Sequence, residues 1–168
     1  MQNLEAKFKL SDLDRARKRA ESIGFQLKGT FRQRDTFFRV PNGKLKMREE
    51  ESACTLIYYQ RGNSGSLKLS DYEIIELPDP QRMRLVLTAS LGVLAEVRKE
   101  RTLLQKGNMR LHLDVVDGLG SFGEIEAVLS QEDDPAPSRK AVEDLITMLD
   151  VRRQSLISAS YFEMLRPV

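Results

Sequence analysis

Residues 109–126 read MRLHLDVVDGLGSFGEIE, and this stretch is the most informative about the fold. In its first half Arg110, His112 and Asp114 alternate with apolar residues, and in its second half Glu124 and Glu126 do the same. Because successive side chains of a strand point to opposite faces, each half predicts a strand with one charged face and one apolar face. The glycine-containing segment between them is typical of a tight connection. The stretch therefore predicts an antiparallel hairpin.

The same two-residue period recurs in other segments of the chain. In each of them the residues of one parity are polar, whereas the residues of the other parity are mostly apolar. The polar residues are Glu5 and Lys7, Lys46 and Arg48, Tyr59 and Arg61, and Lys99 and Arg101. The apolar faces can pack under helices while the polar faces converge.

Turn residues and caps divide the chain into predicted elements. Strands are predicted over residues 3–10, 25–40, 44–50, 53–61, 70–77, 94–105, 109–117 and 122–129. Helices are predicted over residues 12–22, 80–90, 138–149 and 154–165. Because strands follow one another through short turns and helices intervene only occasionally, the fold class is α+β, with a large antiparallel sheet that is closed or nearly closed and helices outside it.

Alternation alone leaves the location of the charged face open. It is compatible with the solvent face of a two-layer sandwich, where alternation is routine. It is equally compatible with the lumen of a barrel whose apolar face turns outward under helices. Two details favour the lumen: Thr, Ser and Gln are rare at these positions, and the carboxylates gather on few strands while cations come from most others.

Composition restricts the kind of protein this is. The 168 residues suit a single domain, residues 1–168, and 27 basic against 25 acidic residues argue against a general nucleic-acid or membrane-surface binder. Cys54 is the only cysteine, which excludes an internal disulfide and a cysteine-based zinc site. Without a secretory signal or a long apolar run, we expect a cytoplasmic protein.

Mixed charges on one face have a chemical use. A triphosphate carries about four negative charges near neutral pH, which lysine and arginine side chains neutralise. Mg²⁺ or Mn²⁺ bridging its oxygens needs carboxylate ligands on the same side. The pattern therefore predicts a site for a metal-bound triphosphate, where positioning and charge neutralisation can promote phosphoryl or nucleotidyl transfer.

Several short motifs, in order along the chain, resemble those of the CYTH superfamily, also called triphosphate tunnel metalloenzymes. They are NLEAK at residues 3–7, QRDTFF at 33–38, LKMR at 45–48, VRKER at 97–101, MRLHLD at 109–114, GLGSFGEIE at 118–126 and SYFEML at 160–165. Each motif alone is weak, but together they are specific and cover almost the whole chain. The resemblance implies an eight-stranded antiparallel tunnel and a triphosphate ligand.

The resemblance also implies roles for individual residues. The positions similar to triphosphate-binding residues are Lys7, Lys46, Arg48, Lys99, Arg101 and Arg110, with Arg61 as a further candidate. The positions similar to residues that bind Mg²⁺ or Mn²⁺ are Glu5, Asp114, Glu124 and Glu126. Gln33 and Asp35 share the parity of the family motif, and either could orient a cation or a ligand. Dimers are common in the family, so a homodimer is expected.

The variant N-x-E-x-K start and the segment Tyr58-Tyr59-Gln60-Arg61 resemble the class IV adenylyl cyclase-like group, which implies conversion of ATP to cyclic AMP and pyrophosphate. Two departures matter. Asn3 replaces the first glutamate of the motif, which removes one carboxylate. Family triphosphatases pair a lysine with a tyrosine to activate water, whereas this chain has Tyr59 or Arg61 and Phe37 at those positions. Hydrolysis of inorganic or organic triphosphates, or binding without turnover, are the alternatives.

Overall fold

The computed structural model describes residues 2–61, 67–130 and 132–165. The strands are β1 (Gln2–Lys9), β2 (Gln26–Phe38), β3 (Lys44–Glu49), β4 (Cys54–Arg61), β5 (Leu67–Glu76), β6 (Val93–Lys106), β7 (Met109–Val116), β8 (Gly120–Leu129) and β9 (Leu156–Ile157). The helices are α1 (Leu13–Ser22), α2 (Pro80–Leu91), α3 (Pro135–Met148) and α4 (Tyr161–Leu165), with a 3-10 turn at Arg153–Ser155.

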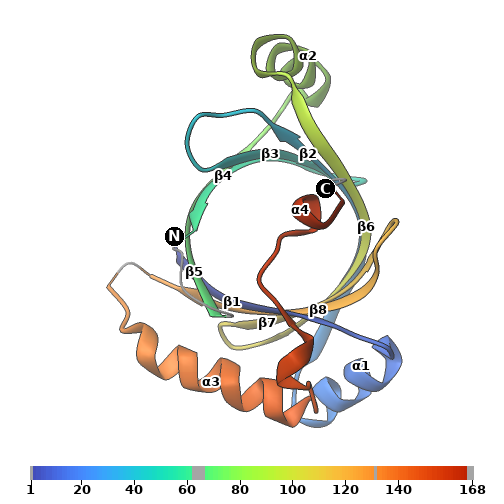
Figure 1. Cartoon of the computed structure of the whole chain (residues 1–168), viewed down its shortest axis with the longest axis vertical. Coiled ribbons are helices and arrows are strands. Elements are labelled where there is room, and N and C mark those ends of the chain that lie inside the picture. Colours follow the sequence, from blue (N-terminus) through green and yellow to red (C-terminus); the bar gives the residue numbers. More distant parts are fainter. Residues whose placement is uncertain (1, 62–66, 131, 166–168) are drawn as a thin grey trace.

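The strands form a closed antiparallel barrel. Their order is β5-β4-β3-β2-β6-β7-β8-β1, and β1 pairs with β5 to complete the ring, as Figure 1 shows in a view along the barrel. The short β9 adds to β1 beyond the end of β5. The predicted α+β fold with a closed eight-stranded sheet is confirmed, which places the charged face in the lumen.

The apolar face of the barrel packs outward against two helices. Leu4, Ala6 and Phe8 of β1 are almost fully buried in one cluster with side chains from β7, β8, α1 and α3. Figure 1 shows α1 and α3 on this side of the barrel and α2 on the opposite side. Burying each large apolar side chain contributes about 1.5–3 kcal/mol, so this layer holds the barrel wall in register with its charged side inward.

Two predicted boundaries near the C-terminus are wrong. The helix predicted from residue 138 begins one turn earlier, because Asp134 accepts a hydrogen bond from the backbone N–H of Ala136 and Pro135 occupies the first turn. The helix predicted over 154–165 is instead a 3-10 turn, the strand β9 and the short helix α4. Pairing of Leu156 and Ile157 with β1 provides an alternative that local periodicity does not reveal.

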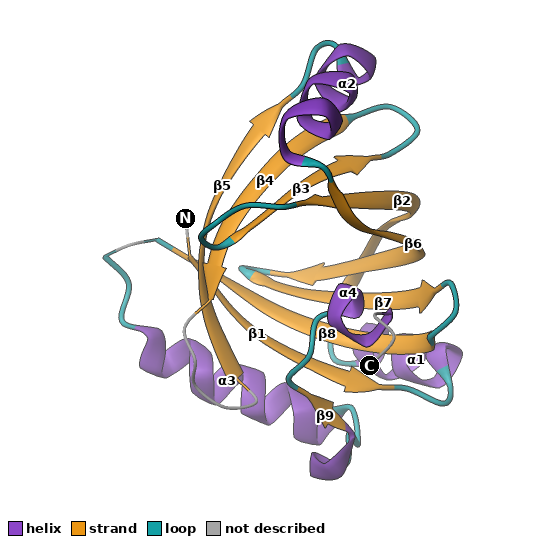
Figure 2. Ribbon diagram, turned by 45° about the horizontal axis from the view of Figure 1, so that its top comes forward, coloured by secondary structure: helices purple, strands orange, loops and turns teal. Residues whose placement is uncertain are grey.

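The C-terminal segment returns to one end of the barrel. Figure 1 shows α4 inside the ring of strands, and Figure 2 shows it at the barrel end. The rings of Phe37 in β2 and Phe162 in α4 stack with centroids 5.1 Å apart. Helix α4 therefore covers this end of the lumen. None of the helices among the described residues is long and apolar enough to cross a membrane.

Candidate functional site

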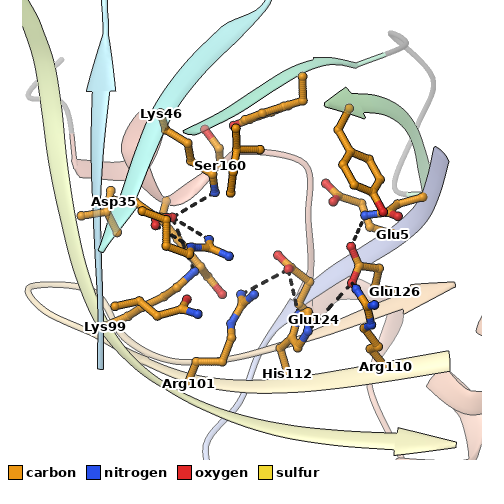
Figure 3. A pocket seen from close by; sticks show the side chains of 18 of the residues that line it. Glu5, Asp35, Lys46, Lys99, Arg101, Arg110, His112, Glu124, Glu126 and Ser160 are labelled. Carbon is orange, nitrogen blue, oxygen red and sulfur yellow. Dashed lines mark hydrogen bonds and ion pairs between the residues drawn. The ribbon is translucent and has the colours of Figure 1, made fainter. Parts of the chain in front are cut away.

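The lumen contains a cavity of about 420 Å³, which is large enough for a small organic phosphate. All eight strands of the barrel contribute side chains to its wall, and Ser160 and Tyr161 contribute from the C-terminal segment (Figure 3). Because inner-face residues alternate with core residues along every strand, the packing of the outer face fixes the direction of each charged side chain.

Asp35 organises one group of cations. Its two carboxylate oxygens accept hydrogen bonds from Arg48 Nε (2.7 Å) and Nη2 (2.8 Å), and its Oδ2 also accepts one from Lys46 Nζ (2.9 Å). Asp35 and Arg48 are direct cross-strand partners, which explains the bidentate geometry. Burial alone would raise the pKa of Asp35, but the charges of Arg48, Lys46 and Lys99 outweigh it and hold this pKa well below the usual value.

Asp114 holds a second cation in the same way. Arg101 donates to its two oxygens over 2.7 and 2.6 Å, and the hydroxyl of Tyr161 donates to Oδ2 over 2.8 Å. Arg101 and Asp114 are also cross-strand partners, and Asp114 is completely inaccessible to solvent. Burial disfavours its charge, but Arg101 and Lys99 together lower the pKa of Asp114 below the usual range.

Lys99 lies between these two groups. Its Nζ is 3.9 Å from Oδ2 of Asp35 and 3.8 Å from Oδ2 of Asp114, and its side chain is only 3% exposed. Burial and the neighbouring Arg101 lower the pKa of Lys99 well below its usual value.

Lys46 has a similar electrostatic environment. Burial and Arg48 lower its pKa to about 8. Including Lys46, the two groups contain four basic side chains and two carboxylates. This imbalance favours an anion in the cavity.

A separate acidic group occupies the wall formed by β1, β7 and β8 (Figure 3). Glu124 contacts Lys7 (3.1 Å), Arg101 (3.2 Å) and His112 Nδ1 (3.3 Å). Burial would raise the pKa of Glu124, but Lys7 and Arg101 keep it well below the usual value. Burial and the charge of Arg101 lower the pKa of His112, despite the opposing effect of Glu124.

Glu126 lies next to this group. It accepts hydrogen bonds from the amide of Asn3 and from Nη1 of Arg110, the latter over 3.4 Å, and it is the cross-strand partner of Glu5. Glu5 and Glu126 both line the cavity, so two carboxylates lie side by side on one wall.

The donors on this wall fit a divalent metal that arrives with a phosphate ligand. Among the described residues, no three Asp, Glu, His or Cys side chains converge closely enough to hold a metal by themselves. Mg²⁺ in proteins commonly takes one or two carboxylates and completes its shell with water and phosphate oxygens. Glu5 and Glu126, with Glu124 nearby, provide hard oxygen donors of this kind, and Glu124 also contacts Arg101 of the cationic groups.

The structure brings most of the predicted site residues together. The cavity is lined by Lys7, Lys46, Arg48, Lys99, Arg101 and Arg110 from the predicted triphosphate-binding set and by Glu5, Glu124 and Glu126 from the predicted metal-binding set. Asp114 lies beneath the cavity wall, where Arg101 and Tyr161 occupy its oxygens. The backbone of Arg61 pairs with Ser70, but its side chain lies outside the described part of the structure.

Among the described residues that sequence reasoning missed, Tyr161 is the one that contacts the cations. Tyr161 lines the cavity, and the Nζ atoms of Lys7 and Lys99 lie 4.1 and 5.3 Å from the centroid of its ring. Alternation could not identify it, because it belongs to a short helix rather than to a strand. The only available signal was its place in the SYFEML motif.

The fold and site define a class of protein: an antiparallel barrel whose lumen contains basic side chains that carboxylates hold in place. Such a lumen is suited to binding a polyphosphate. Residues 1–161 match the family model of the CYTH domain, and the chain therefore belongs to the CYTH family. Members of this family are generally metal-dependent enzymes that bind triphosphates.

Individual relatives are distant but span the same length. A Methanocaldococcus jannaschii protein provisionally named an adenylate cyclase is 23% identical over 98% of this chain and 98% of its own. A solved structure from Pyrococcus horikoshii has a TM-score of 0.87 at 21% identity, covering 98% of this chain and 99% of that one. A Hippeastrum protein, described as an adenylyl cyclase candidate with a dominant triphosphatase activity, has a TM-score of 0.68 at 18% identity over 96% and 93%.

Proposed function

We propose that this protein binds a metal–triphosphate complex in its lumen and converts ATP to cyclic AMP and pyrophosphate. The observation that carries the proposal is the arrangement of Lys46, Arg48, Lys99 and Arg101 around two buried aspartates. Pre-positioned cations in a water-poor cavity neutralise a polyphosphate without reorganising during the reaction.

Each aspartate acts in this proposal as a positioning residue. Asp35 accepts two hydrogen bonds from the guanidinium of Arg48, and Asp114 accepts two from that of Arg101. These bidentate contacts keep each guanidinium in a fixed orientation in the absence of ligand. Only part of its donor capacity is used, because a guanidinium has five N–H groups. The remaining N–H groups of Arg48 and Arg101, together with the Lys99 ammonium, are the proposed phosphate donors.

The proposed metal donors are Glu5, Glu124 and Glu126, on the opposite wall from Asp35. When bound, a divalent metal supplies further charge neutralisation at phosphate oxygens. In the present arrangement Glu124 is engaged by Lys7, and Glu126 is engaged by Asn3 and Arg110. Ligand binding then redistributes these ion pairs, with Lys7 and Arg110 passing from carboxylate to phosphate.

The proposed reaction is an internal displacement at phosphorus. The ribose 3′ oxygen forms a bond to the α-phosphorus, the bond from that phosphorus to the bridging oxygen of the β-phosphate breaks, and pyrophosphate leaves with the electron pair. The hydroxyl proton leaves to solvent. Cations around the β- and γ-phosphates stabilise the charge that develops on the leaving group.

Hydrolysis of a triphosphate is the second candidate. The described activity of the Hippeastrum relative favours it. Against it, Phe37 cannot take the role of a tyrosine in water activation, and its ring is stacked on Phe162. Lys46 is close to the rings of Tyr59 and Phe37, with Nζ 5.7 Å from each centroid, but it is hydrogen-bonded to Asp35.

The test is incubation of the protein with ATP and Mg²⁺ or Mn²⁺, with separate assays for cyclic AMP, pyrophosphate and phosphate. Cyclic AMP formed together with pyrophosphate is the expected result. Phosphate release from ATP or tripolyphosphate without cyclic AMP would establish the second candidate instead. Binding without any product would leave a triphosphate-binding module.

Arg48→Ala and Arg101→Ala should each reduce binding and turnover. The matched control is Arg98→Ala, on the same strand as Arg101. Arg98 is mostly exposed, pairs with Glu96 and does not line the cavity, so this variant should match the wild type. If neither lumen variant weakens binding, the triphosphate site is not where we propose it.

A further inference from the structure

Unpaired polar atoms are concentrated at the cavity. Among the described residues, four buried side-chain oxygens have no hydrogen-bond partner: Asn3 Oδ1, Gln33 Oε1, Ser70 Oγ and Thr36 Oγ1. The first three belong to residues that line the cavity, and all three residues are more than nine-tenths buried. Buried polar groups in folded proteins are normally hydrogen-bonded, so this group requires an explanation.

The orientation of the two amides follows from their neighbours. The amide nitrogen of Asn3 donates to Glu126, and that of Gln33 donates to Glu50 over 2.5 Å. Because an ionised carboxylate only accepts hydrogen bonds, the nitrogen of each amide must face the carboxylate. Each amide therefore leaves its oxygen as the unpaired atom, and this oxygen can only accept.

A phosphate chain cannot satisfy the two amide oxygens. Fully ionised phosphate oxygens are acceptors, and an acceptor does not pair with an amide oxygen. The partner must offer hydrogen-bond donors. Ser70 is the direct cross-strand partner of Asn3, so an amide acceptor and a hydroxyl lie next to each other. This pair matches an alcohol, which donates one hydrogen bond and accepts another.

Apolar side chains line the same cavity where it becomes exposed. Phe31 is 37% exposed and Ile74 is 43% exposed, and both belong to the cavity wall. By contrast, the cation Lys99 and the cation Arg101 are almost completely buried. The cavity therefore has a charged interior and a partly apolar exposed part. Phe31 lies two residues from Gln33 on the same face of β2, which places an aromatic ring beside an amide acceptor.

We propose that the part of the cavity that contains these buried polar atoms and the exposed Phe31 is a nucleoside subsite, in which Asn3 and Ser70 bind a sugar hydroxyl and Gln33 accepts a hydrogen bond from an amino group of a base that contacts Phe31. This inference rests on the proposed binding of a triphosphate in the lumen and specifies its substrate as a nucleoside triphosphate with an amino-bearing base. Inorganic tripolyphosphate would leave both amide oxygens unpaired.

Calorimetric titration in EDTA, where metal-dependent turnover is suppressed, tests the subsite. The ligands are ATP, 2′,3′-dideoxy-ATP, inosine triphosphate and tripolyphosphate. The protein variants are Asn3→Leu, Ser70→Ala and Gln33→Met, and Thr36→Val is the matched control because it removes the unpaired buried hydroxyl that does not line the cavity.

The wild type should bind ATP about five- to tenfold more tightly than the dideoxy and inosine analogues. Asn3→Leu and Ser70→Ala should abolish the preference over dideoxy-ATP while keeping the preference over inosine triphosphate. Gln33→Met should have the reverse effect, and Thr36→Val should keep both preferences. Ser70→Ala removes only one unpaired hydroxyl, so it tests the sugar contact if Asn3→Leu does not fold.

Several results would overturn the subsite. One is equal binding of all nucleotides by the wild type, and another is an equal loss for every ligand in the variants. A third is a loss that is absent in EDTA and appears only when the titration is repeated with Mn²⁺, which would make the amide oxygens metal ligands. If the wild type binds tripolyphosphate but not ATP, the subsite fails and the triphosphate site stands. If it binds neither, both proposals fail.

Discussion

The hydroxyl of Tyr161 donates a hydrogen bond over 2.8 Å to Oδ2 of Asp114, which connects the C-terminal helix to the inner wall of the barrel. Asp114 in turn holds Arg101 by two hydrogen bonds. The direction of a proposed phosphate donor therefore depends on a side chain from the far end of the chain. Because Asp114 and the ring of Tyr161 are buried, this contact is protected from competition by water.

Tyr161→Phe should destabilise the protein and weaken triphosphate binding. The variant keeps the ring beneath Lys7 and Lys99 but removes one hydrogen bond to a buried carboxylate. We expect the free energy of unfolding to fall by about 1.5–3 kcal/mol, measured by urea denaturation. Calorimetry with tripolyphosphate should show a several-fold loss of affinity.

Tyr58→Phe is the control for this change. The hydroxyl of Tyr58 accepts a hydrogen bond from Gln60 outside the cavity, so its loss should change the free energy of unfolding by less than about 1 kcal/mol. An equal effect of the two variants would mean that the contact with Asp114 has no special role.

Asp35→Asn should produce a protein that depends on anions for stability. The substitution leaves Lys46 and Arg48 buried without their carboxylate, which we expect to cost about 3–5 kcal/mol. Tripolyphosphate can replace the missing negative charge. The rise in Tm on adding tripolyphosphate should therefore be larger for the variant than for the wild type, as measured by thermal unfolding.

Asp71→Asn provides a comparison at an exposed aspartate, which accepts a hydrogen bond from Gln2. Its effect should remain within about 0.5 kcal/mol, and its response to tripolyphosphate should equal that of the wild type. If Asp35→Asn changes stability and the tripolyphosphate response as little as Asp71→Asn does, Lys46 and Arg48 do not require the carboxylate of Asp35.

The sequence predicts the barrel wall well and its ends poorly, for a physical reason. Side chains of a strand alternate strictly, so the charges of residues 109–126 mark one face without knowledge of any partner strand. The end of the lumen is covered by Tyr161 and Phe162 from a five-residue helix whose position depends on contacts with β2 and with Asp114 of β7. Such contacts are not encoded in local periodicity.

The sequence also could not distinguish the carboxylates that hold an arginine side chain from the carboxylates that we propose as metal ligands. Asp35 and Asp114 look like Glu124 and Glu126 in a pattern of alternating polar residues. All four face a cation across strands, since Glu124 faces Lys7 and Glu126 faces Arg110. What separates them is geometry and burial: Asp35 and Asp114 each accept two hydrogen bonds from one guanidinium, and they are the most buried of the four. Strand register determines these pairs, and register depends on packing of the outer face: β2 and β3 pack against α2, whereas β7 packs against α1 and α3.

Lys46 should contribute an increase in stability as pH rises through the alkaline range. Burial and the charge of Arg48 lower its pKa in the folded protein from 10.5 to about 8. Between these two values the unfolded chain binds more protons than the folded one, so the free energy of unfolding increases as pH rises. Urea denaturation at several pH values between 8 and 10.5 measures the slope.

Lys46→Met should reduce this slope without abolishing it, because the pKa of Lys99 is lowered for the same reasons. Lys140→Met is the control: Lys140 is exposed on α3 and Asp144 raises its pKa, so its contribution to the slope has the opposite sign and its loss should not reduce the slope. An unchanged slope in Lys46→Met would show that Lys46 is solvated in the folded protein.

Glu126→Gln and Asp114→Asn should change different quantities, because Glu126 lines the cavity and Asp114 lies beneath it. The first should affect metal binding, and the second should affect stability and metal-free ATP binding. Loss of a metal-binding carboxylate should weaken Mn²⁺ binding to the ATP complex by at least about tenfold, observed by electron paramagnetic resonance, and leave stability nearly unchanged. Loss of the charge behind Arg101 should lower the free energy of unfolding and weaken ATP binding in EDTA. If Asp114→Asn instead affects only the Mn²⁺ signal, Asp114 is a metal ligand, and the role of holding Arg101 must belong to Glu124.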